Sequence, residues 1–313
     1  MRDVPASDVD RLGQLEESVW ALVGFVHLAG SGALTAEGLH PVTAQDAAAA
    51  ELLRAVGLID AGGEPTGVLG DVVQGGLLEL RRQAAISTLR QAATATTVEP
   101  GGAPGWAIQD DETLLAQGRA SAMAGRMMAA MVVPSLDGLA ERFADGGQFL
   151  DVGVGVAGLS AAFCEMVPTA RVLGIDVMPR VLDLARRTIA EHDLGDRLDV
   201  QLVGVEELDE HGRFDLAWMP APFLPQVVFG PGLRRVHDAL RPGGWLIVGA
   251  GRFEGDPLAV AVTRWKTLAS GGTPLTADDA DAELGAAGFT DLRELPTPPG
   301  SPVVYAARRP LAG

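Results

Sequence analysis

Three glycines after an apolar run could bring a backbone turn close to a bound ligand. Residues 148–160 read QFLDVGVGVAGLS, in which Gly153, Gly155 and Gly158 have the spacing G-x-G-x-x-G. Because glycine lacks a side chain, the chain can turn sharply here and lie against a ligand before the next helix begins. This spacing serves nicotinamide dinucleotides in one class of proteins and S-adenosylmethionine in another.

Two acidic residues near this turn bear on the choice of ligand. Asp151 stands two residues before Gly153. A carboxylate there would repel the pyrophosphate of a dinucleotide but attract the cationic sulfonium and α-amino groups of S-adenosylmethionine. Asp176 ends the run RVLGID and suits both ligands, because each offers ribose hydroxyls to an acid on the second strand. We therefore predict S-adenosylmethionine as the cofactor.

The elements that must position these residues alternate between short apolar strands and helices from Ser135 onward. This alternation predicts an α/β fold, a doubly wound, Rossmann-like seven-stranded sheet. The loop PTPPGS between the last two strands is too short for a crossover helix, so the last strand should be antiparallel. The expected strands are residues 148–152, 171–176, 198–203, 214–219, 245–250, 289–295 and 302–308, and the expected helices are 157–167, 179–192, 226–240, 255–269 and 276–287.

The N-terminal part has a different pattern of predicted secondary structure. Residues 1–100 read as helices around a small Gly-rich hairpin, which predicts a mainly helical, winged-helix-like domain. Residues 101–134 read as a linker and a connecting helix that Pro134 should end. Residues 135–313 form the predicted cofactor-binding domain. The connecting helix is rich in methionine, and Met127 and Met131 are either core residues or part of a substrate pocket.

Composition excludes several classes of function. The chain has 313 residues with 24 Lys and Arg against 41 Asp and Glu, a net charge of −17 that disfavours nucleic acid as a partner. One cysteine allows no intrachain disulfide, and no His, Asp or Glu cluster has metal-ligand spacing, so we predict no metal site. The start MRDVPASDVDRLG lacks the features of a signal peptide, and no apolar run reaches the length of a membrane span. We expect a cytoplasmic protein with no membrane partner.

Residues 135–313 resemble the class I S-adenosylmethionine-dependent methyltransferases. LDVGVGVAGLS is similar to the glycine motif of that family and VLGIDVMPRVLDLAR to its acidic second motif. RFDLAWMPAPFLP is similar to the fourth-strand motif, and LRRVHDALRPGGWLIVGA to the helix, turn and fifth strand. Two positions depart from the pattern, because Ala157 replaces the third glycine and Val205 replaces an aspartate that often contacts the adenine amine.

The resemblance implies a set of binding residues. The backbone at Asp151, Gly153 and Gly155 would hold the methionine end, and Glu206 or backbone groups would replace the missing aspartate. Trp218 and Met219 would face the methyl group. The residues implied to bind the cofactor are Asp151, Gly153, Gly155, Gly158, Asp176, Val177, Met178, Val205, Glu206 and Met219, and those expected to contact the substrate are Trp218, Phe223, Met127 and Met131.

The whole chain also resembles the small-molecule O-methyltransferases, which carry an N-terminal winged-helix-like dimerisation domain. The resemblance implies a homodimeric methyltransferase of secondary metabolism. Many such enzymes use a histidine base after the fourth strand, but MPAPFLPQVVFGPG contains no His, Asp or Glu. His237 on the following helix and His27 on the first helix are the remaining candidates for a base.

The missing base shapes the predicted reaction. It favours an acceptor that is already acidic or nucleophilic, such as a phenol, enol, carboxylate or carbon nucleophile, for which alignment alone promotes transfer. An alternative is an enzyme that binds S-adenosylmethionine but catalyses another reaction, such as a cyclisation aided by the sulfonium charge. A ligand-sensing regulator that binds DNA is disfavoured, because TAQDAAAAELLRAVG carries Arg54 alone against Asp46 and Glu51.

Overall fold

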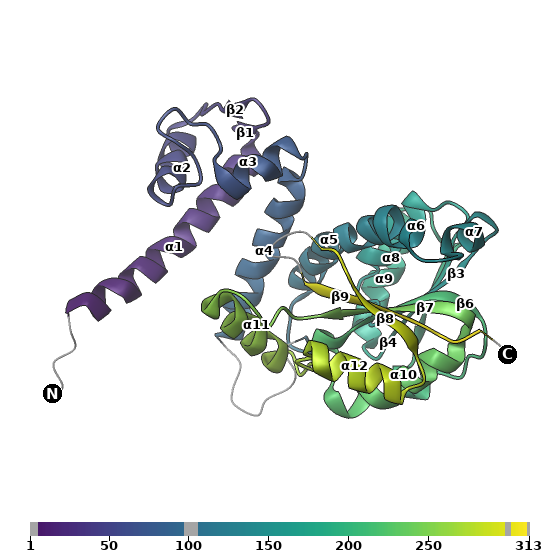
Figure 1. Cartoon of the computed structure of the whole chain (residues 1–313). Helices are drawn as coiled ribbons and strands as arrows, with labels where there is room; N and C mark the ends of the chain where they lie inside the picture. Colours follow the sequence, from purple (N-terminus) through teal and green to yellow (C-terminus); the bar gives the residue numbers. More distant parts are fainter. Residues whose placement is uncertain (1–5, 97–105, 298–301, 312–313) are drawn as a thin grey trace. The chain divides into compact units, whose positions relative to one another are not determined.

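The computed structural model describes residues 6–96, 106–297 and 302–311. The chain divides into two compact units, Met1–Arg90 and Gln91–Gly313. Each unit is described by itself, and Figure 1 identifies the elements of both.

The first unit is mainly helical. Its second helix begins at Thr43, whose side chain accepts a hydrogen bond from the backbone N–H of Asp46 while the Asp46 carboxylate accepts one from the backbone of Thr43. The Gly-rich segment expected to form the small hairpin makes a single antiparallel bridge between Ile59 and Pro65, whereas β1 and β2 form a hairpin that was not predicted. The elements are α1 (Ala6–Ser31), β1 (Leu34–Thr35), β2 (Gly38–Leu39), α2 (Ala44–Ala55), α3 (Gly67–Gln74) and α4 (Leu78–Ala95), whose last residues extend into the second unit.

The second unit begins with a helical segment and continues as an alternation of strands and helices. Its helices are α5 (Asp111–Met127), a π-helical turn (Met128–Val132), α6 (Val133–Ser135), α7 (Leu139–Ala144), α8 (Gly158–Met166), α9 (Pro179–Glu191), α10 (Gln226–Ala239), α11 (Pro257–Ala269) and α12 (Ala277–Ala286). Its strands are β3 (Gln148–Val152), β4 (Arg171–Asp176), β5 (Leu198–Leu202), β6 (Phe214–Pro220), β7 (Leu240–Ala250), β8 (Thr290–Leu295) and β9 (Val303–Arg308).

These strands form one seven-stranded sheet in the order β5-β4-β3-β6-β7-β9-β8. The five strands from β5 to β7 are parallel, whereas β9 pairs antiparallel with both β7 and β8. The predicted fold class is therefore confirmed, including the antiparallel last strand. One apolar core lies between the sheet and α10 and α12, and a second lies between the other face and α7, α8 and α9 (Figure 1).

The connecting helix differs from its prediction at its end. Pro134 does not stop it, because a π-helical turn precedes the proline and the helical path continues to Ser135. Pro134 falls in the first turn of α6, where the missing N–H matters least. The π-helical turn shifts the direction of the side chains that follow it, which bears on the methionines.

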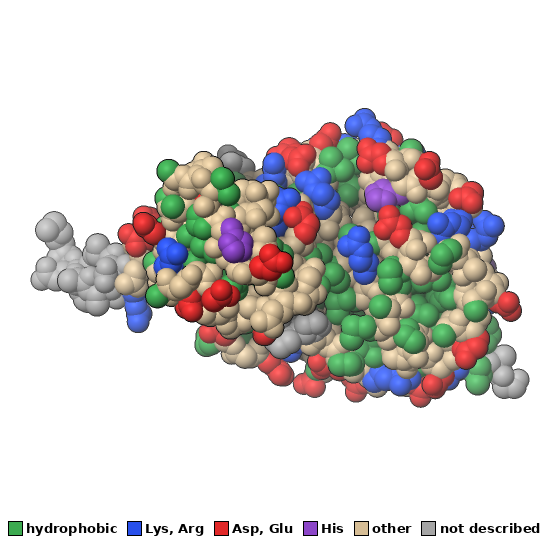
Figure 2. All heavy atoms as spheres, turned by 90° about the horizontal axis from the view of Figure 1, so that it is seen from above, with side chains coloured by type: hydrophobic (Ala, Val, Ile, Leu, Met, Phe, Trp, Pro, Cys, Tyr) green, Lys and Arg blue, Asp and Glu red, His purple; other side chains and the backbone are tan. Residues whose placement is uncertain are grey.

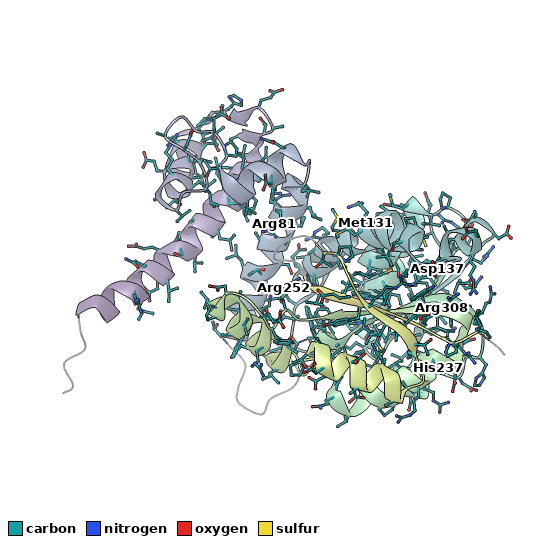
Figure 3. The ribbon with its side chains drawn as sticks, viewed as in Figure 1. Arg81, Met131, Asp137, His237, Arg252 and Arg308 are labelled. Atoms are coloured by element: carbon teal, nitrogen blue, oxygen red, sulfur yellow. The ribbon has the colours of Figure 1, made fainter. Side chains whose placement is uncertain are left out.

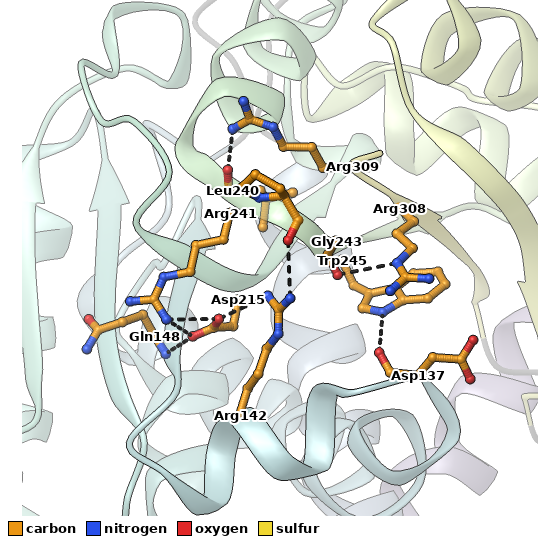
Figure 4. A network of polar contacts seen from close by, with 11 residues as sticks. Asp137, Arg142, Gln148, Asp215, Leu240, Arg241, Gly243, Trp245, Arg308 and Arg309 are labelled. Carbon is orange, nitrogen blue, oxygen red and sulfur yellow. Dashed lines mark hydrogen bonds and ion pairs between the residues drawn. The ribbon is translucent and has the colours of Figure 1, made fainter. Parts of the chain in front are cut away.

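The amino ends of the parallel strands carry a dense polar network (Figure 4). Asp215, at the start of β6, is fully buried and accepts hydrogen bonds from Arg142 Nη1 at 3.2 Å, Arg241 Nη1 at 3.1 Å and the backbone N–H of Gln148 at 2.9 Å. Each lone-pair direction of this carboxylate therefore meets a donor, and two of the donors are cationic. The network joins β3, β6 and α7 to the start of β7.

Trp245 anchors the same edge of the sheet. Its indole N–H donates to the carbonyl oxygen of Asp137 at 3.3 Å, and the guanidinium groups of Arg293 and Arg308 lie 4.8 and 5.3 Å from its ring centre. Arg308 also donates to the carbonyl oxygen of Gly243 at 3.4 Å. These contacts attach the antiparallel strands β8 and β9 to β7 at its amino end (Figure 4).

Candidate functional site

The glycine turn joins the carboxyl end of β3 to α8. Gly153 and Gly155 have φ of 69° and 57°, a left-handed conformation that favours glycine. The backbone N–H groups of Gly153 and Val154 both donate to the carbonyl oxygen of Ile175, at 2.8 and 3.0 Å. The turn is thereby fixed against the end of β4, where Asp176 follows Ile175.

Ala157, which departs from the family pattern, has a strained backbone conformation. It has a φ of 64°, the left-handed conformation that a glycine would adopt more easily, and it is fully buried as the N-cap of α8. A residue with a β-carbon is strained in this region by roughly 1–2 kcal/mol. The backbone therefore keeps the path expected for a third glycine, although alanine occupies the position.

Gly158 makes a close helix contact. A β-carbon on Gly158 would lie 2.1 Å from the carbonyl oxygen of Gly118, and one on Gly118 would lie 2.2 Å from Val156 Cγ2. A β-carbon on Gly125, two turns further along α5, would lie 2.2 Å from the carbonyl oxygen of Leu159. The missing side chain of Gly158 thus lets α5 pack against the start of α8, and its contact with a cofactor stays a prediction.

Asp176 faces the glycine turn from the end of β4. Its Oδ2 accepts a hydrogen bond from the backbone N–H of Gly155 at 3.1 Å, and its Oδ1 accepts one from the backbone N–H of Met178 at 3.0 Å. Burial raises the pKa of Asp176, and hydrogen bonds from the backbone of Met178, Gly155 and Val177 oppose that rise. The carboxylate has about four lone-pair sites, so at least one is left that can accept a ribose hydroxyl.

Asp151 does not present its carboxylate to the outside of the turn. The residue is 2% exposed, and its Oδ2 accepts a hydrogen bond from Ser160 Oγ of α8 at 2.5 Å. Burial raises its pKa to about 7, and the hydrogen bond from Ser160 opposes the rise while the charge of Asp176 adds to it. The expectation of an acid near the loop that attracts a cation therefore needs correction, because this side chain points toward α8.

Trp218 and Met219 at the end of β6 lie on opposite faces of the sheet. Met219 is fully buried in the core under α10, where a β-carbon on Gly232 would lie 3.1 Å from Met219 Cε. The expectation that both residues face the methyl group is wrong for Met219, because successive side chains on a strand alternate in direction. Trp218 is partly buried on the α8 side, and its ring lies against Gly249 of β7.

The region after β5 offers no side-chain acceptor at the predicted position. Val205 is 3% exposed and belongs to the core under α10. The side-chain carboxylate of Glu206 folds back over Gly204. The backbone carbonyl oxygen of Glu206 accepts a hydrogen bond from Arg235 Nε at 3.2 Å. Val177 after β4 is exposed, whereas Met178 is partly buried against an apolar cluster.

A tryptophan that sequence reasoning missed lies at this edge of the sheet. The Trp106 ring packs edge-to-face against Phe223 after β6, with ring centres 5.3 Å apart at 83°. Trp106 also packs against a cluster that includes Val156 of the glycine turn, together with Met178. It lies in a Gly- and Pro-rich stretch that resembles a linker, and the only local signal was an aromatic residue within that stretch.

The two methionines predicted for the substrate pocket differ in exposure. Met127, at the end of α5, is half-buried, whereas Met131 is 49% exposed (labelled in Figure 3) and Met128 is 3% exposed. The π-helical turn Met128–Val132 follows Met127, and Met128 is the buried one of the three methionines. Contact of Met127 and Met131 with a substrate stays a prediction.

His237 does not lie at the carboxyl edge of the sheet. His237 is in the last turn of α10, which returns the chain to the amino end of β7 (Figure 3). Its ring packs edge-to-face against Phe289, so its assignment as a base is wrong. His27 belongs to the first unit, where its Nε2 lies 2.8 Å from Oδ1 of the buried Asp46 that caps α2.

Searches for other kinds of site gave two findings. Within residues 6–96, 106–297 and 302–311, no group of three or more His, Cys, Asp or Glu is arranged to hold a metal ion. In the same part of the chain, no helix is long and apolar enough to cross a membrane. Figure 2 shows acidic side chains dispersed around the visible face, in keeping with the net charge of −17.

Comparison with known proteins gives a matching domain family and several similar folds. Residues 149–244 match a family described as methyltransferase domain, which spans β3 to β7 of the sheet. No curated protein matches the chain. In fold, the chain is similar to the S-adenosylmethionine-dependent methyltransferase SibL in its apo form, with 21% identity, coverage of 97% of this chain and 99% of that chain, and a TM-score of 0.66.

Two further solved structures are similar along their full length. One is an O-methyltransferase family protein from Burkholderia thailandensis, with 18% identity, coverage of 100% of both chains and a TM-score of 0.59. The other is human N-acetylserotonin methyltransferase in complex with S-adenosylmethionine, with 16% identity, coverage of 99% of this chain and 100% of that chain, and a TM-score of 0.62. These likenesses concern the fold.

Residues 149–244 therefore match a methyltransferase domain, and the fold of the chain is similar to that of class I S-adenosylmethionine-dependent methyltransferases. The fold is similar both to that of an O-methyltransferase family protein and to that of a methyltransferase whose structure contains S-adenosylmethionine. The geometry fits this cofactor at the glycine turn and Asp176, where the backbone can approach a ligand closely and a carboxylate can accept hydroxyl groups.

Proposed function

We propose that the protein transfers a methyl group from S-adenosylmethionine to a small molecule whose acceptor atom is a phenol, enol or carboxylate oxygen, or a nucleophilic carbon. The observation that carries this proposal is the Asp176 carboxylate, which the N–H groups of Gly155 and Met178 orient at the carboxyl edge of the sheet. A ribose at that position would leave the sulfonium over the ends of β3 and β6.

The chain's contribution to transfer is alignment. Residues 219–232 after β6 contain no ionisable side chain, so no general base is assigned there. Phe223 and Trp106 instead form an aromatic wall beside the end of β6. Such a wall restrains the acceptor and excludes water, which favours in-line attack on the methyl group by a nucleophile that is already reactive.

Within this proposal the cofactor contacts are shared among three loops. Gly153 and Gly155 present backbone groups to the methionine end, and Asp176 accepts the ribose hydroxyls. Val177 and Met178 pack against the adenine. Trp218, Phe223 and Met127 are the proposed neighbours of the acceptor, because each is partly or largely exposed at or near the carboxyl edge.

Calorimetric titration tests the cofactor first. The protein is titrated with S-adenosylhomocysteine and, in parallel, with NADH. We expect micromolar binding of the former and no heat from the latter. Acceptors are then screened by S-adenosylhomocysteine release with phenols, carboxylic acids and enolisable ketones. Binding of NADH instead would contradict the proposal.

The same assay separates the alternative reaction from methyl transfer. The absence of an ionisable side chain in residues 219–232 also suits an enzyme that binds S-adenosylmethionine and catalyses a cyclisation through the sulfonium charge. Consumption of a substrate without release of S-adenosylhomocysteine would identify that reaction. Release of one S-adenosylhomocysteine per product identifies methyl transfer.

We further propose a homodimer formed through α1. This helix exposes a row of large apolar side chains, which an isolated chain would leave in water: Leu12, Leu15, Val19, Trp20 and Val23. Burial of such a row by a second copy contributes roughly 25 cal/mol per Å² of apolar surface. Sedimentation of the wild type should give a dimer, and Leu15→Glu should give a monomer; a monomeric wild type would contradict the proposal.

The remaining assignments rest on the resemblance to O-methyltransferases. We propose a winged-helix-like dimerisation domain at residues 1–100, a linker and connecting helix at 101–134, and a catalytic domain at 135–313. The same resemblance supports an enzyme of secondary metabolism, and a cytoplasmic location stays the expectation drawn from the sequence. Removal of residues 1–100 tests the division, because the catalytic domain should then keep S-adenosylhomocysteine binding but lose dimerisation.

A further inference from the structure

Two polar side-chain atoms just before α5 are buried without a hydrogen-bond partner among the described residues. They are the indole Nε1 of Trp106 and the amide Oε1 of Gln109. Gln109 is 6% exposed. Buried polar atoms nearly always have partners, because an unmade hydrogen bond costs free energy, so each of these two atoms calls for an explanation.

An arginine attaches this segment to the start of α9. Arg180 Nη1 donates to the carbonyl oxygen of Gln109 at 2.9 Å, and Arg180 Nε donates to Asp111 Oδ1 at 2.7 Å. Arg180 stands two residues after Met178. The segment from Trp106 to Asp111 therefore lies alongside the loop that carries Asp176 and Met178 after β4.

Trp106 reaches the loops that follow three neighbouring strands. It packs against a cluster that contains Val156 after β3 and Val181 of α9, which follows β4, and it contacts Phe223 after β6. These strands are adjacent in the order β4-β3-β6. The segment therefore covers the carboxyl edge of the sheet where the glycine turn lies.

The two atoms have opposite hydrogen-bonding roles. An indole N–H only donates, and an amide oxygen only accepts. The edge of adenine offers the complement, because its 6-amino group donates and its ring nitrogen N1 accepts. The residue after β5 that would contact the amine in the family pattern is the buried Val205, which has no polar side-chain atom.

We propose that Gln109 and Trp106 recognise the adenine edge of the cofactor, Gln109 Oε1 accepting from the 6-amino group and Trp106 Nε1 donating to N1. This inference rests on the proposed function. Neither atom is exposed to water in the ligand-free chain, so the proposal requires these two side chains to move aside when the base enters. The binding step then supplies the hydrogen bonds that both atoms lack.

S-inosylhomocysteine is the probe that tests this pairing. It is identical to S-adenosylhomocysteine except that hypoxanthine carries an accepting carbonyl in place of the amine and a donating N1–H, which reverses both roles. The wild type is titrated calorimetrically with each compound. We expect S-adenosylhomocysteine to bind at least about 10-fold more tightly, as follows when two hydrogen bonds are reversed.

Substitutions assign the preference to these two residues. Gln109→Leu and Trp106→Phe should each weaken S-adenosylhomocysteine binding about 5-fold and leave S-inosylhomocysteine binding unchanged, so the preference falls. Gln109→Glu keeps an acceptor and should retain the preference. Trp265→Phe, on the exposed face of α11, is the matched control and should change neither affinity. Thermal melting of every variant confirms that each is folded.

The outcomes separate this inference from the proposed function. A wild type that binds both compounds equally, or variants that weaken both compounds by the same factor, would overturn the adenine pairing while the methyltransferase proposal stands. A wild type that binds neither compound would overturn both. A preference that falls in Gln109→Leu and Trp106→Phe but persists in Gln109→Glu and Trp265→Phe establishes the pairing.

Discussion

Two buried carboxyl groups at opposite edges of the sheet have different surroundings. Asp215, at the amino edge, accepts hydrogen bonds from two arginines and a backbone N–H. Asp151, near the carboxyl edge, accepts one from the hydroxyl of Ser160, and burial raises its pKa to about 7. The first carboxylate is fully paired with cations, whereas the second lacks any cationic partner among the described residues. The contacts at the amino edge therefore stabilise the fold.

Other features extend the contrast between the edges. The amino edge holds Trp245 between two arginines with its N–H bonded. The carboxyl edge holds Ala157 in a left-handed conformation and the unpartnered atoms of Trp106 and Gln109. Strain and unpaired groups persist only where the surrounding structure fixes them, and they concentrate at functional sites. The contrast supports the proposed site at the carboxyl edge.

The largest expected effect concerns the pH dependence that Asp151 imposes. Its pKa rises from 3.8 in the unfolded chain to about 7 in the fold, so the folded state binds the extra proton between these values. Stability contributed by this group is therefore complete below about pH 4 and declines as the pH rises to about 7. At about 1.4 kcal/mol per unit of pKa, the decline is on the order of 4 kcal/mol.

Urea unfolding of the wild type and of Asp151→Asn from pH 4 to pH 8 measures this decline. Asparagine keeps the acceptor for Ser160 but does not ionise, so the variant should become more stable relative to the wild type as the pH rises. The difference between the two proteins isolates this group from all other carboxylates. A difference in unfolding free energy that stays constant from pH 4 to pH 8 would contradict the raised pKa of Asp151, and with it the contrast to Asp215.

Asp215→Asn should destabilise the amino edge by about 3 kcal/mol. The substitution removes the charge that pairs with Arg142 and Arg241 and turns an amide N–H₂ toward the guanidinium groups. Both arginines are partly exposed and regain water, which limits the loss. Urea unfolding measures the change, and S-adenosylhomocysteine affinity should stay the same. An affinity that falls with stability would show that the edges are not independent.

Gly158→Ala should destabilise the second unit by about 2–3 kcal/mol. The new β-carbon would lie 2.1 Å from the carbonyl oxygen of Gly118, and backbone atoms cannot move aside as a side chain does. Gly195→Ala is the matched control, because nothing lies within 4 Å of its β-carbon and its φ is not left-handed. Equal unfolding free energies for the two variants would contradict the close packing of α5 and α8.

Ala157→Gly should give the smallest effect, a gain in stability of about 0.5 kcal/mol. Glycine adopts a φ of 64° without strain, although it loses more entropy on folding. Ala144→Gly, in the exposed last turn of α7, should instead lower stability by about 0.5–1 kcal/mol. A loss of stability in both variants would contradict the strain inferred at Ala157.

The sequence predicted the sheet well because local patterns determine it. Apolar runs located all seven strands to within a few residues, and the short PTPPGS loop predicted the antiparallel last strand. The helices α8 to α12 followed from the same alternation, whereas α7 was missed. Each of these features depends on residues that are neighbours along the chain, so periodicity is sufficient to find them.

The candidate site was less accessible to sequence reasoning. Trp106 is recognised as part of the site only from its packing against Phe223 and against the cluster that Met178 also contacts. Met178 and Phe223 are more than seventy residues away along the chain, so no local pattern encodes this packing. The π-helical turn Met128–Val132 was not expected from the sequence, and Met131 within it is exposed. The error at Met219 was avoidable, because strand alternation already separates it from Trp218.

Calorimetric titration of the wild type and Asp176→Asn with S-adenosylhomocysteine tests the central claim most directly. We predict micromolar binding to the wild type and binding at least about 10-fold weaker to the variant, since a charge-assisted acceptor of the ribose hydroxyls is lost. Asp209→Asn, on an exposed loop, should bind like the wild type. Equal affinity in Asp176→Asn, or no binding to the wild type, would contradict the assignment of the carboxyl edge as the cofactor site.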